Sequence, residues 1–260
     1  VSLNDYLGKY FPGLPYTGIT VHNLLSHTSG LPEYFNFKES WFPVGRLTTN
    51  QDVVDVLIKY QPKILFQPNT QYKYTNTNYA LLALIVEQTS GMKFEDYVRK
   101  NIFEPAGMNS SFYITERTEK IGWSIATGHK ADRIPLEIKG LDGTFGDKGM
   151  YSTVEDLFAW KKAYFNNYKI ISKNMVETAT TKRNELKDGK LPSEEYGYGW
   201  HLENSPCYGR LVYHGGLWHG YNHVLLYYPE KNIFMVFLSN YCNRAHLRQT
   251  SVVLHLMCGA

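Results

Sequence analysis

The sequence has few cysteines and no long run of apolar residues. Its three cysteines, Cys207, Cys242 and Cys258, are far apart and show no C-x-x-C spacing. This pattern gives no support to a zinc knuckle or a redox pair, so we expect buried or idle thiols. No apolar stretch is long enough to span a bilayer, so we expect no transmembrane segment in this sequence.

Charge of one sign is also scarce. Lys and Arg exceed Asp and Glu by only three residues, and no basic cluster concentrates the excess. The sequence therefore argues against a nucleic-acid partner. A signal segment with a charged start and an apolar centre is missing too, and the chain begins with Val1. This indicates a processed protein or a chain cut at its start.

Internal repeats and low-complexity linkers are missing as well. A chain of 260 residues can bury a large core as one domain or as two closely joined ones, so we expect one compact body with room for two lobes. Tyrosine is abundant, at 21 residues. Most of these rings should be half-buried packing, although such a density also suits a polar-rimmed cleft.

Helical spacing of apolar residues dominates the first part of the chain. The clearest amphipathic stretch is 49–60, in which the valines and Leu57 share one face. A strongly apolar stretch ends at Gly91, a residue type that commonly terminates helices. The predicted helices cover 20–29, 49–60, the stretch ending at Gly91, 94–103 with a break over Pro105-Ala106-Gly107, and 153–165. Thr20 and either Ser152 or Thr153 are the predicted caps.

The last part of the chain changes to short β-type runs. Strands are predicted around 210–214, 222–228 and 233–239, with an amphipathic helix near 244–257. The run 233–239 is apolar on both faces, which is typical of an interior strand covered on both sides.

Three separated motifs stand out against this background. They are Tyr74-Thr75-Asn76, then 146–153 (GDKGMYST) followed by Glu155-Asp156-Leu157, then Tyr213-His214-Gly215-Gly216. Their order and rough spacing resemble the serine β-lactamase-like family, which includes penicillin-binding proteins, D,D-peptidases and esterases. Flanking phrases such as ITVHNLLSHTSGLP, IFEPAGM and YGYGW extend the resemblance to essentially the whole chain. Each motif alone is weak, but the ordered set is specific.

The resemblance implies an α+β fold of the β-lactamase/transpeptidase kind. This fold has an antiparallel sheet flanked by helices and a mainly helical region. Residues 1–20 would be the remnant of an N-terminal α/β part, 21–205 the mainly helical region, and 206–260 the C-terminal part of the α/β domain. The N-terminal strands and the nucleophile helix would be absent from this sequence.

The resemblance also implies hydrolysis of an amide, an ester or a β-lactam through an acyl-enzyme on serine. Tyr74 matches the family's tyrosine that shuttles protons, and such a phenol works near neutral pH only if cationic neighbours lower its pKa from about 10. Asn76 matches the asparagine whose amide can both donate to and accept from a substrate.

The third motif matches the strand that lines the family's cleft. Gly215 and Gly216 would let the substrate backbone lie close to this strand, and the N–H of Leu217 would donate to the oxyanion. His214 stands where many relatives carry lysine. Histidine gives a weaker, pH-dependent charge for a substrate carboxylate, which favours a peptidase or esterase over an efficient β-lactamase.

Each of these residues also has a simpler interpretation. Taken alone, Asn76 is more often a helix cap, and His214 an ordinary residue at the end of a strand. Near the third motif, Trp218, His219 and His223 suit rim or packing positions, because they lack the spacing of metal ligands. His22 and His27 are interpreted as structural.

The nucleophile is the part of the pattern that is not found. The family carries it as Ser-x-x-Lys, with both side chains on one helical turn. The string Ser90-Gly91-Met92-Lys93 has this spacing, but Gly91 would end the helix and separate the two side chains. We therefore expect the nucleophile upstream of residue 1.

Two other classes of function stay open at this point. One is a catalytically inactive protein that binds D-amino-acid peptides or cell-wall fragments. The other is a metal-dependent hydrolase, which is weak because the nine histidines show no ligand spacing. We expect a small-molecule or peptide substrate, no cofactor and no metal, and by resemblance a location outside the cytoplasm, in the periplasm, secreted or membrane-anchored.

Overall fold

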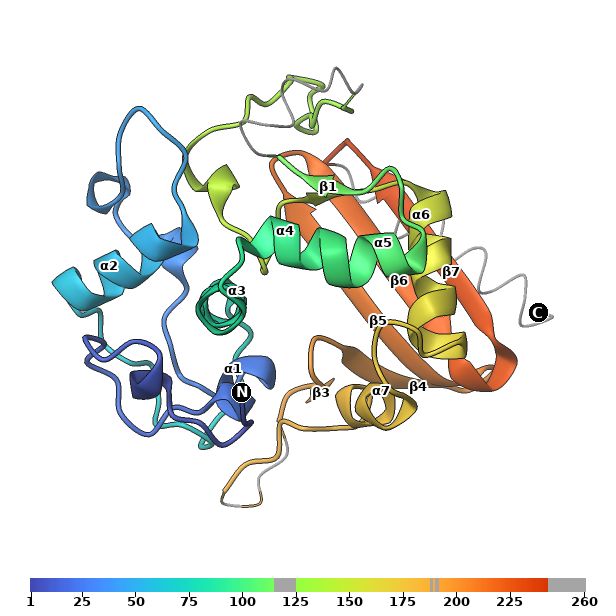
Figure 1. Cartoon of the computed structure of the whole chain (residues 1–260), viewed down its shortest axis with the longest axis horizontal. Coiled ribbons are helices and arrows are strands. Elements are labelled where there is room, and N and C mark those ends of the chain that lie inside the picture. Colours follow the sequence, from blue (N-terminus) through green and yellow to red (C-terminus); the bar gives the residue numbers. More distant parts are fainter. Residues whose placement is uncertain (115–124, 188, 190–191, 243–260) are drawn as a thin grey trace.

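A computed structural model describes residues 1–114, 125–187, 189 and 192–242. Figure 1 shows a region of helices and long loops beside an antiparallel sheet, with further helices lying across the sheet. The α+β architecture predicted from the sequence is confirmed. The division at residues 20 and 205 stays a prediction.

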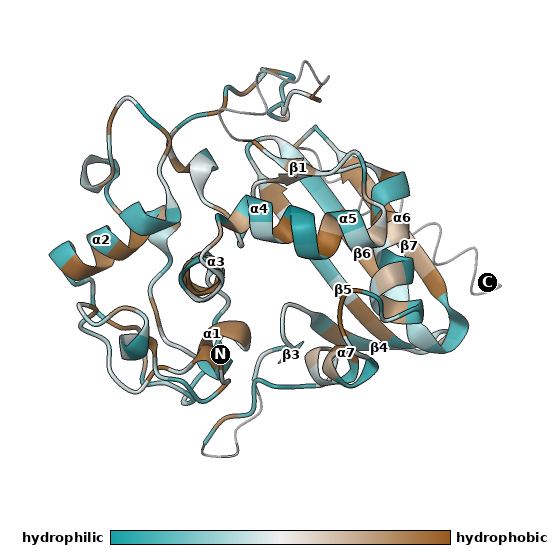
Figure 2. Ribbon diagram, in the orientation of Figure 1, coloured by the Kyte–Doolittle hydropathy of each residue, from teal (hydrophilic) through white to brown (hydrophobic). Residues whose placement is uncertain are grey.

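Three helices organise the first region, α1 (Val21–Leu25), α2 (Asn50–Tyr60) and α3 (Asn76–Ser90). Thr20 and Thr49 cap α1 and α2, since each hydroxyl accepts from a backbone N–H of the first turn. The valine face of α2 is buried as predicted and packs in one core with α1 and α3. Figure 2 shows the hydrophobic residues of α2 on one side of the helix.

The helix α3 is apolar on most of its surface, because it lies between other elements rather than on the outside. Leu81 is completely buried, and burying a leucine contributes about 1.5–3 kcal/mol. The helix ends where Gly91 takes a left-handed conformation with a φ of 68°. This end was predicted, and it fixes α3 as a rigid support for the residues at its start.

The second group of helices lies over the sheet (Figure 1). It consists of α4 (Phe94–Val98), a π-helical turn (Arg99–Phe103), α5 (Glu104–Ala106), α6 (Val154–Lys161), a further π-helical turn (Lys162–Asn166) and α7 (Lys173–Ala179). Thr153, one of the two predicted caps, begins α6. The break predicted over Pro105, Ala106 and Gly107 falls at the last of these residues, because proline is tolerated in the first turn of α5 and Gly107 ends the helix in a left-handed conformation.

The main sheet has the order β3-β4-β5-β6-β7 and is antiparallel throughout. Its strands are β3 (Glu195–Tyr196), β4 (His201–Ser205), β5 (Gly209–Trp218), β6 (Tyr221–Tyr228) and β7 (Ile233–Ser239). A small sheet pairs β1 (Phe112–Tyr113) with β2 (Met150–Tyr151). The three predicted strands are confirmed, but the sheet begins before residue 206, since β3 and β4 precede it.

The apolar strand β7 is an end strand of the described sheet. It pairs with β6, contacts α6, and is mostly half-buried rather than covered on both sides as predicted. The helix predicted near 244–257 lies outside the described residues.

The expectation of idle thiols is wrong for one of the three cysteines. Cys207 is disulfide-bonded, whereas Cys242 is a free thiol and Cys258 lies outside the described residues. No helix among the described residues is long and apolar enough to cross a bilayer.

Candidate active site

All three motifs line one cavity of about 1440 Å³. Tyr74 and Asn76 come from the start of α3, and Gly146–Thr153 from the loop that leads into α6. His214 and the residues after it come from β5. Segments separated by more than a hundred residues therefore meet at one place, and the predicted site residues share it.

The Tyr74 ring is held from behind by a buried histidine. The ring centroids of Tyr74 and His27 are 4.2 Å apart, and His27 Nδ1 accepts from the backbone N–H of Thr75 at 3.2 Å. His27 was interpreted as structural from the sequence, and it supports this motif directly. The Tyr74 and His214 centroids are 6.0 Å apart.

Burial raises the pKa of Tyr74 above its ordinary value, and the carboxylates of Asp147 and Glu33 raise it further. Among the described residues, the charged groups that affect the pKa of Tyr74 are these two carboxylates. No cation of the described residues lowers it. With the described residues alone around it, the Tyr74 phenol is protonated at neutral pH. It is therefore suited to donate a proton.

Asn76 is oriented by Glu33. The carboxylate Oε2 of Glu33 accepts from the backbone N–H of Asn76 at 2.8 Å and from its Nδ2 at 2.9 Å. Thr75, not Asn76, is the N-cap residue of α3, so the simpler interpretation of Asn76 as a cap is wrong. Sequence reasoning missed Glu33, which lies 43 residues upstream and outside the three motifs.

His214 is an uncharged group in this structure. Its Nδ1 lies 2.7 Å from the Gly215 carbonyl oxygen, and its Nε2 lies 3.4 Å from the Tyr196 hydroxyl. Burial, and next the neighbouring His201, lower the pKa of His214 to about 4. The pH-dependent positive charge expected from the sequence is therefore largely absent near neutral pH.

The residues after His214 continue along the cavity in β5. Leu217 is 61% exposed, and both glycines line the cavity. At Gly216 a Cβ would collide with the imidazole of His223, whereas at Gly215 it would meet only ordinary contact with a backbone oxygen. Gly216 thus makes room for a side chain of β6, and Gly215 leaves the cavity wall open.

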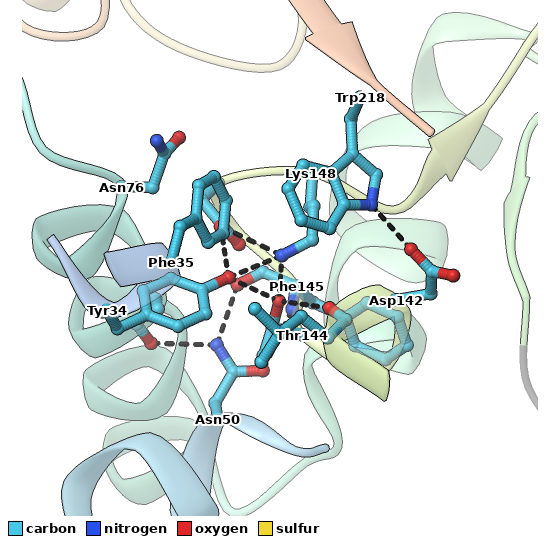
Figure 3. Close-up of polar contacts among 12 residues, drawn as sticks. Tyr34, Phe35, Asn50, Asn76, Asp142, Thr144, Phe145, Lys148 and Trp218 are labelled. Atoms are coloured by element: carbon cyan, nitrogen blue, oxygen red, sulfur yellow. Dashed lines mark hydrogen bonds and ion pairs between the residues drawn. The ribbon is translucent and has the colours of Figure 1, made fainter. Parts of the chain in front are cut away.

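Lys148 and Asp147 form a buried ion pair at the cavity, and Figure 3 shows Lys148 among the side chains that surround it. Lys148 Nζ lies 3.1 Å from Asp147 Oδ2 and also donates to the Tyr34 hydroxyl and to Thr144 Oγ1. The side chains of Lys148 and Asp147 are 8% and 0% exposed. Burial raises the pKa of Asp147 and lowers that of Lys148, and each partner's charge opposes the shift.

Lys148 also joins the two sides of the cavity. Its Nζ lies 4.8 Å from the ring centroids of both Phe35 and Trp218, and these two rings are 4.4 Å apart. Among the described residues that line the cavity, Lys148 is the only lysine or arginine, and Asp147 offsets its charge. The GDKGMYST motif was noted in the sequence, but nothing in it indicated these partners.

Two histidine–carboxylate pairs line the cavity as well. His201 Nδ1 lies 2.8 Å from Glu194 Oε2, and His219 Nδ1 lies 2.6 Å from Asp142 Oδ2. Asp142 also accepts from Trp218 Nε1, which agrees with the rim position expected for Trp218 and His219. His201 and Glu194 were not predicted.

The string Ser90-Gly91-Met92-Lys93 does not form part of the cavity lining. Ser90 ends α3 and its hydroxyl accepts from the Met92 backbone N–H at 3.2 Å. His22, the other histidine interpreted as structural, contacts the Tyr198 hydroxyl at 2.8 Å through Nδ1. The described residues contain no cluster of three or more side chains suited to hold a metal ion.

Comparison with known proteins gives consistent matches. Residues 1–251 match the protein family described as Beta-lactamase. The chain is 35% identical over 253 residues to Penicillin-binding protein 4* of Bacillus subtilis (strain 168), which covers 92% of this chain and 55% of that protein. It is 24% identical over 242 residues to the D-aminopeptidase of Brucella ovis, covering 92% of this chain and 44% of that protein.

Solved structures match the fold. An octameric penicillin-binding protein homologue from Pyrococcus abyssi has a TM-score of 0.82 at 29% identity and covers 98% of this chain and 60% of its own. A D-amino acid amidase from Ochrobactrum anthropi has a TM-score of 0.71 at 24% identity, covering 93% of this chain and 78% of its own. The chain spans about half the length of the curated relatives it matches.

Proposed function

Because the chain belongs to the Beta-lactamase family, we propose that the whole protein is a serine hydrolase that forms and then hydrolyses an acyl-enzyme. One observation carries the proposal, namely that Tyr74, Asn76 and His214 line the same cavity. Acyl transfer needs a proton carrier beside an activated hydroxyl, a side chain that binds the substrate amide, and N–H donors for the oxyanion. The serine itself is expected in a segment upstream of residue 1, as the resemblance implies.

Tyr74 is the proposed proton donor to the leaving group. Its raised pKa keeps the phenol protonated, which suits donation and disfavours the role of base. Asn76, oriented by Glu33, would bind the substrate carbonyl, and the N–H of Leu217 would contribute to the oxyanion hole. A lysine next to the nucleophile would supply the cation that lets Tyr74 also accept protons.

The charges of the cavity favour amides and esters over substrates with a free carboxylate. His214 is uncharged near neutral pH because its pKa is about 4, and Asp147 offsets the charge of Lys148. Asp142 and Glu194 also line the cavity. A substrate carboxylate would therefore find little positive charge here. The names D-aminopeptidase and D-amino acid amidase among the similar proteins agree with an amide substrate.

Intact-protein mass spectrometry of the full-length protein tests the proposal. We expect a covalent adduct on a serine followed three residues later by lysine, which forms readily with an activated ester and more slowly with a penicillin, because the free carboxylate of a penicillin finds little positive charge in the cavity. The absence of any adduct would overturn the proposal. Binding of a D-amino-acid dipeptide without an adduct, measured by calorimetry, would then identify the catalytically inactive binding protein instead.

A further inference from the structure

The strand β4 brings a histidine with a paired carboxylate to the cavity. His201 Nδ1 lies 2.8 Å from Glu194 Oε2, and their side chains are 19% and 50% exposed. Both residues line the cavity. A carboxylate that accepts from Nδ1–H fixes the tautomer, so that the lone pair of the imidazole lies on Nε2. His201 therefore has the electronic arrangement of a general base.

The His201 ring is also held in position. Its centroid lies 5.1 Å from that of Tyr213 in a stacked arrangement and 4.9 Å from that of Tyr196 in an edge contact. The register of the sheet places it there, since His201 pairs with Tyr213 on one side and with Tyr196 on the other. Two rings and a carboxylate thus leave the imidazole little freedom to turn.

His201 lies beside the two motif residues that would perform the chemistry. Its ring centroid is 5.2 Å from that of His214 and 6.1 Å from that of Tyr74. In deacylation Tyr74 has to donate a proton to the serine oxygen, so it is better placed as the acid of this step than as its base, and His214 is a poor proton acceptor. Burial raises the pKa of Tyr74 and keeps the phenol protonated, while the pKa of His214, lowered to about 4, makes its imidazole a weak base.

Two other imidazoles near the motif residues, those of His27 and His219, are less suited. His27 is completely buried, and its Nδ1 already accepts from the Thr75 backbone N–H. His219 has a carboxylate partner, Asp142, but His219 lies in the turn between β5 and β6. Of the two described histidine–carboxylate pairs that line the cavity, His201–Glu194 is the one in ring contact with Tyr74.

We propose that His201, held by Glu194, is the general base that activates the hydrolytic water for deacylation. This role rests on the proposed acyl-enzyme function. His201 Nε2 takes a proton from water as the water oxygen bonds to the acyl carbon. The bond between that carbon and the serine oxygen then breaks, and the Tyr74 phenol protonates the serine oxygen. The proton on His201 returns to Tyr74, which leaves free serine and a carboxylic acid.

The lifetime of the acyl-enzyme measures this step. The full-length protein is mixed with p-nitrophenyl acetate, and the burst of p-nitrophenol reports acylation, while quenched samples weighed by mass spectrometry report loss of the acyl group. In His201→Asn we expect a retained burst and deacylation slowed by about 100-fold or more, the lower range for general acid–base catalysis. In Glu194→Gln the slowing should be smaller.

A matched control comes from the other pair. His219→Asn removes a histidine with the same kind of partner from the same cavity, and asparagine tolerates the left-handed conformation of residue 219, where φ is 46°. We expect its acyl-enzyme lifetime to match the wild type. Added imidazole should restore part of the deacylation rate in His201→Ala, which a purely structural role would not explain.

The outcomes separate this role from the proposed function. No acyl adduct in the wild-type protein would overturn the acyl-enzyme function and the role of His201 together. An adduct that forms in the wild type and decays equally fast in His201→Asn would overturn the role of His201 alone. Slow decay in both His201→Asn and His219→Asn, without rescue of His201→Ala by imidazole, would also overturn it.

Discussion

The two walls of the cavity hold their polar groups in different ways. On the helical wall, formed by the start of α3 and the 144–148 loop, side-chain hydrogen bonds and a buried ion pair fix Asn76 and Lys148. On the sheet wall, formed by β4 and β5, aromatic rings and one half-exposed carboxylate hold His201 and His214. The first wall depends mainly on a buried ion pair, and the second mainly on aromatic rings.

Because of this difference, the two walls should respond differently to substitution and to pH. A buried charge whose partner is removed costs several kcal/mol, so the helical wall tolerates few substitutions. The imidazoles of the sheet wall have no such charge to lose near neutral pH at His214, whose pKa is about 4 because burial disfavours its charged form. The comparison predicts that stability should respond most to changes in the helical wall, and that catalysis and pH dependence should respond to the sheet wall and to Tyr74 between them.

The largest effect on stability is expected from Lys148→Met. This change leaves the fully buried Asp147 carboxylate without its cation, so the free energy of unfolding should fall by about 3–5 kcal/mol. Urea denaturation of the full-length protein measures it. Adding Asp147→Asn should recover part of the loss, because the unpaired charge is gone.

An exposed pair provides the control for this change. Lys9 lies 3.0 Å from Asp5 with its side chain 60% exposed, so Lys9→Met should leave the unfolding midpoint unchanged within error. Equal midpoints for Lys148→Met and Lys9→Met would remove the contrast between the walls.

The largest effect on catalysis is expected from Tyr74→Phe. Turnover should fall by about 100-fold or more, because the proposed proton donor is lost while the ring still packs against His27. Steady-state kinetics with an activated ester measures the change, and the midpoint of unfolding should hardly move.

Tyr16→Phe should show the opposite pattern. The Tyr16 hydroxyl donates to the Pro62 carbonyl at 2.7 Å in the helical core, so its loss should cost about 1 kcal/mol of stability and leave turnover unchanged. Unchanged activity in Tyr74→Phe would exclude Tyr74 from the mechanism.

How far the sequence could predict these walls depends on the kind of contact. Periodicity located α2, α3 and the long strands, because apolar residues repeat along each of them. The motif order brought Tyr74, Asn76 and His214 together as candidates. The strand β4 was missed because it has only five residues and a single buried one, Leu202. So short a strand shows no alternating pattern in the sequence.

The partners of the site residues could not be predicted for a different reason. Tyr34 and Lys148 are 114 residues apart, and Glu33 reaches Asn76 across 43 residues. A hydrogen bond leaves no periodic signal in the sequence, so nothing distinguished Glu33 from other carboxylates. The same holds for Glu194, which looks like a surface residue until the strands place it beside His201.

A moderate effect is expected from Glu33→Gln. The glutamine can still accept a hydrogen bond from Asn76, but hydrogen bonds to a charged group are stronger than neutral ones by about 1 kcal/mol. Since Asn76 would be held less firmly, KM should rise by several-fold with a smaller change in kcat. Steady-state kinetics measures both. Glu39→Gln, at an exposed glutamate that begins the next 3-10 helix, is the control, and an equal rise in KM there would contradict the orienting role of Glu33.

The smallest effect is the pH dependence of stability contributed by the sheet wall. The pKa of His214 is about 4 in the folded protein, against 6.5 as its ordinary value. Between these pH values the unfolded chain binds more protons than the folded one, so the free energy of unfolding rises with pH across this window and levels off above it. Buried His27, whose pKa is also lowered well below 6.5, adds a slope of the same sign.

Urea denaturation at a series of pH values should therefore show a shallower rise in the free energy of unfolding in His214→Gln than in the wild type. An identical rise in both would mean that His214 keeps its ordinary pKa and can be positively charged when a substrate binds. The contrast between the two walls would then be wrong.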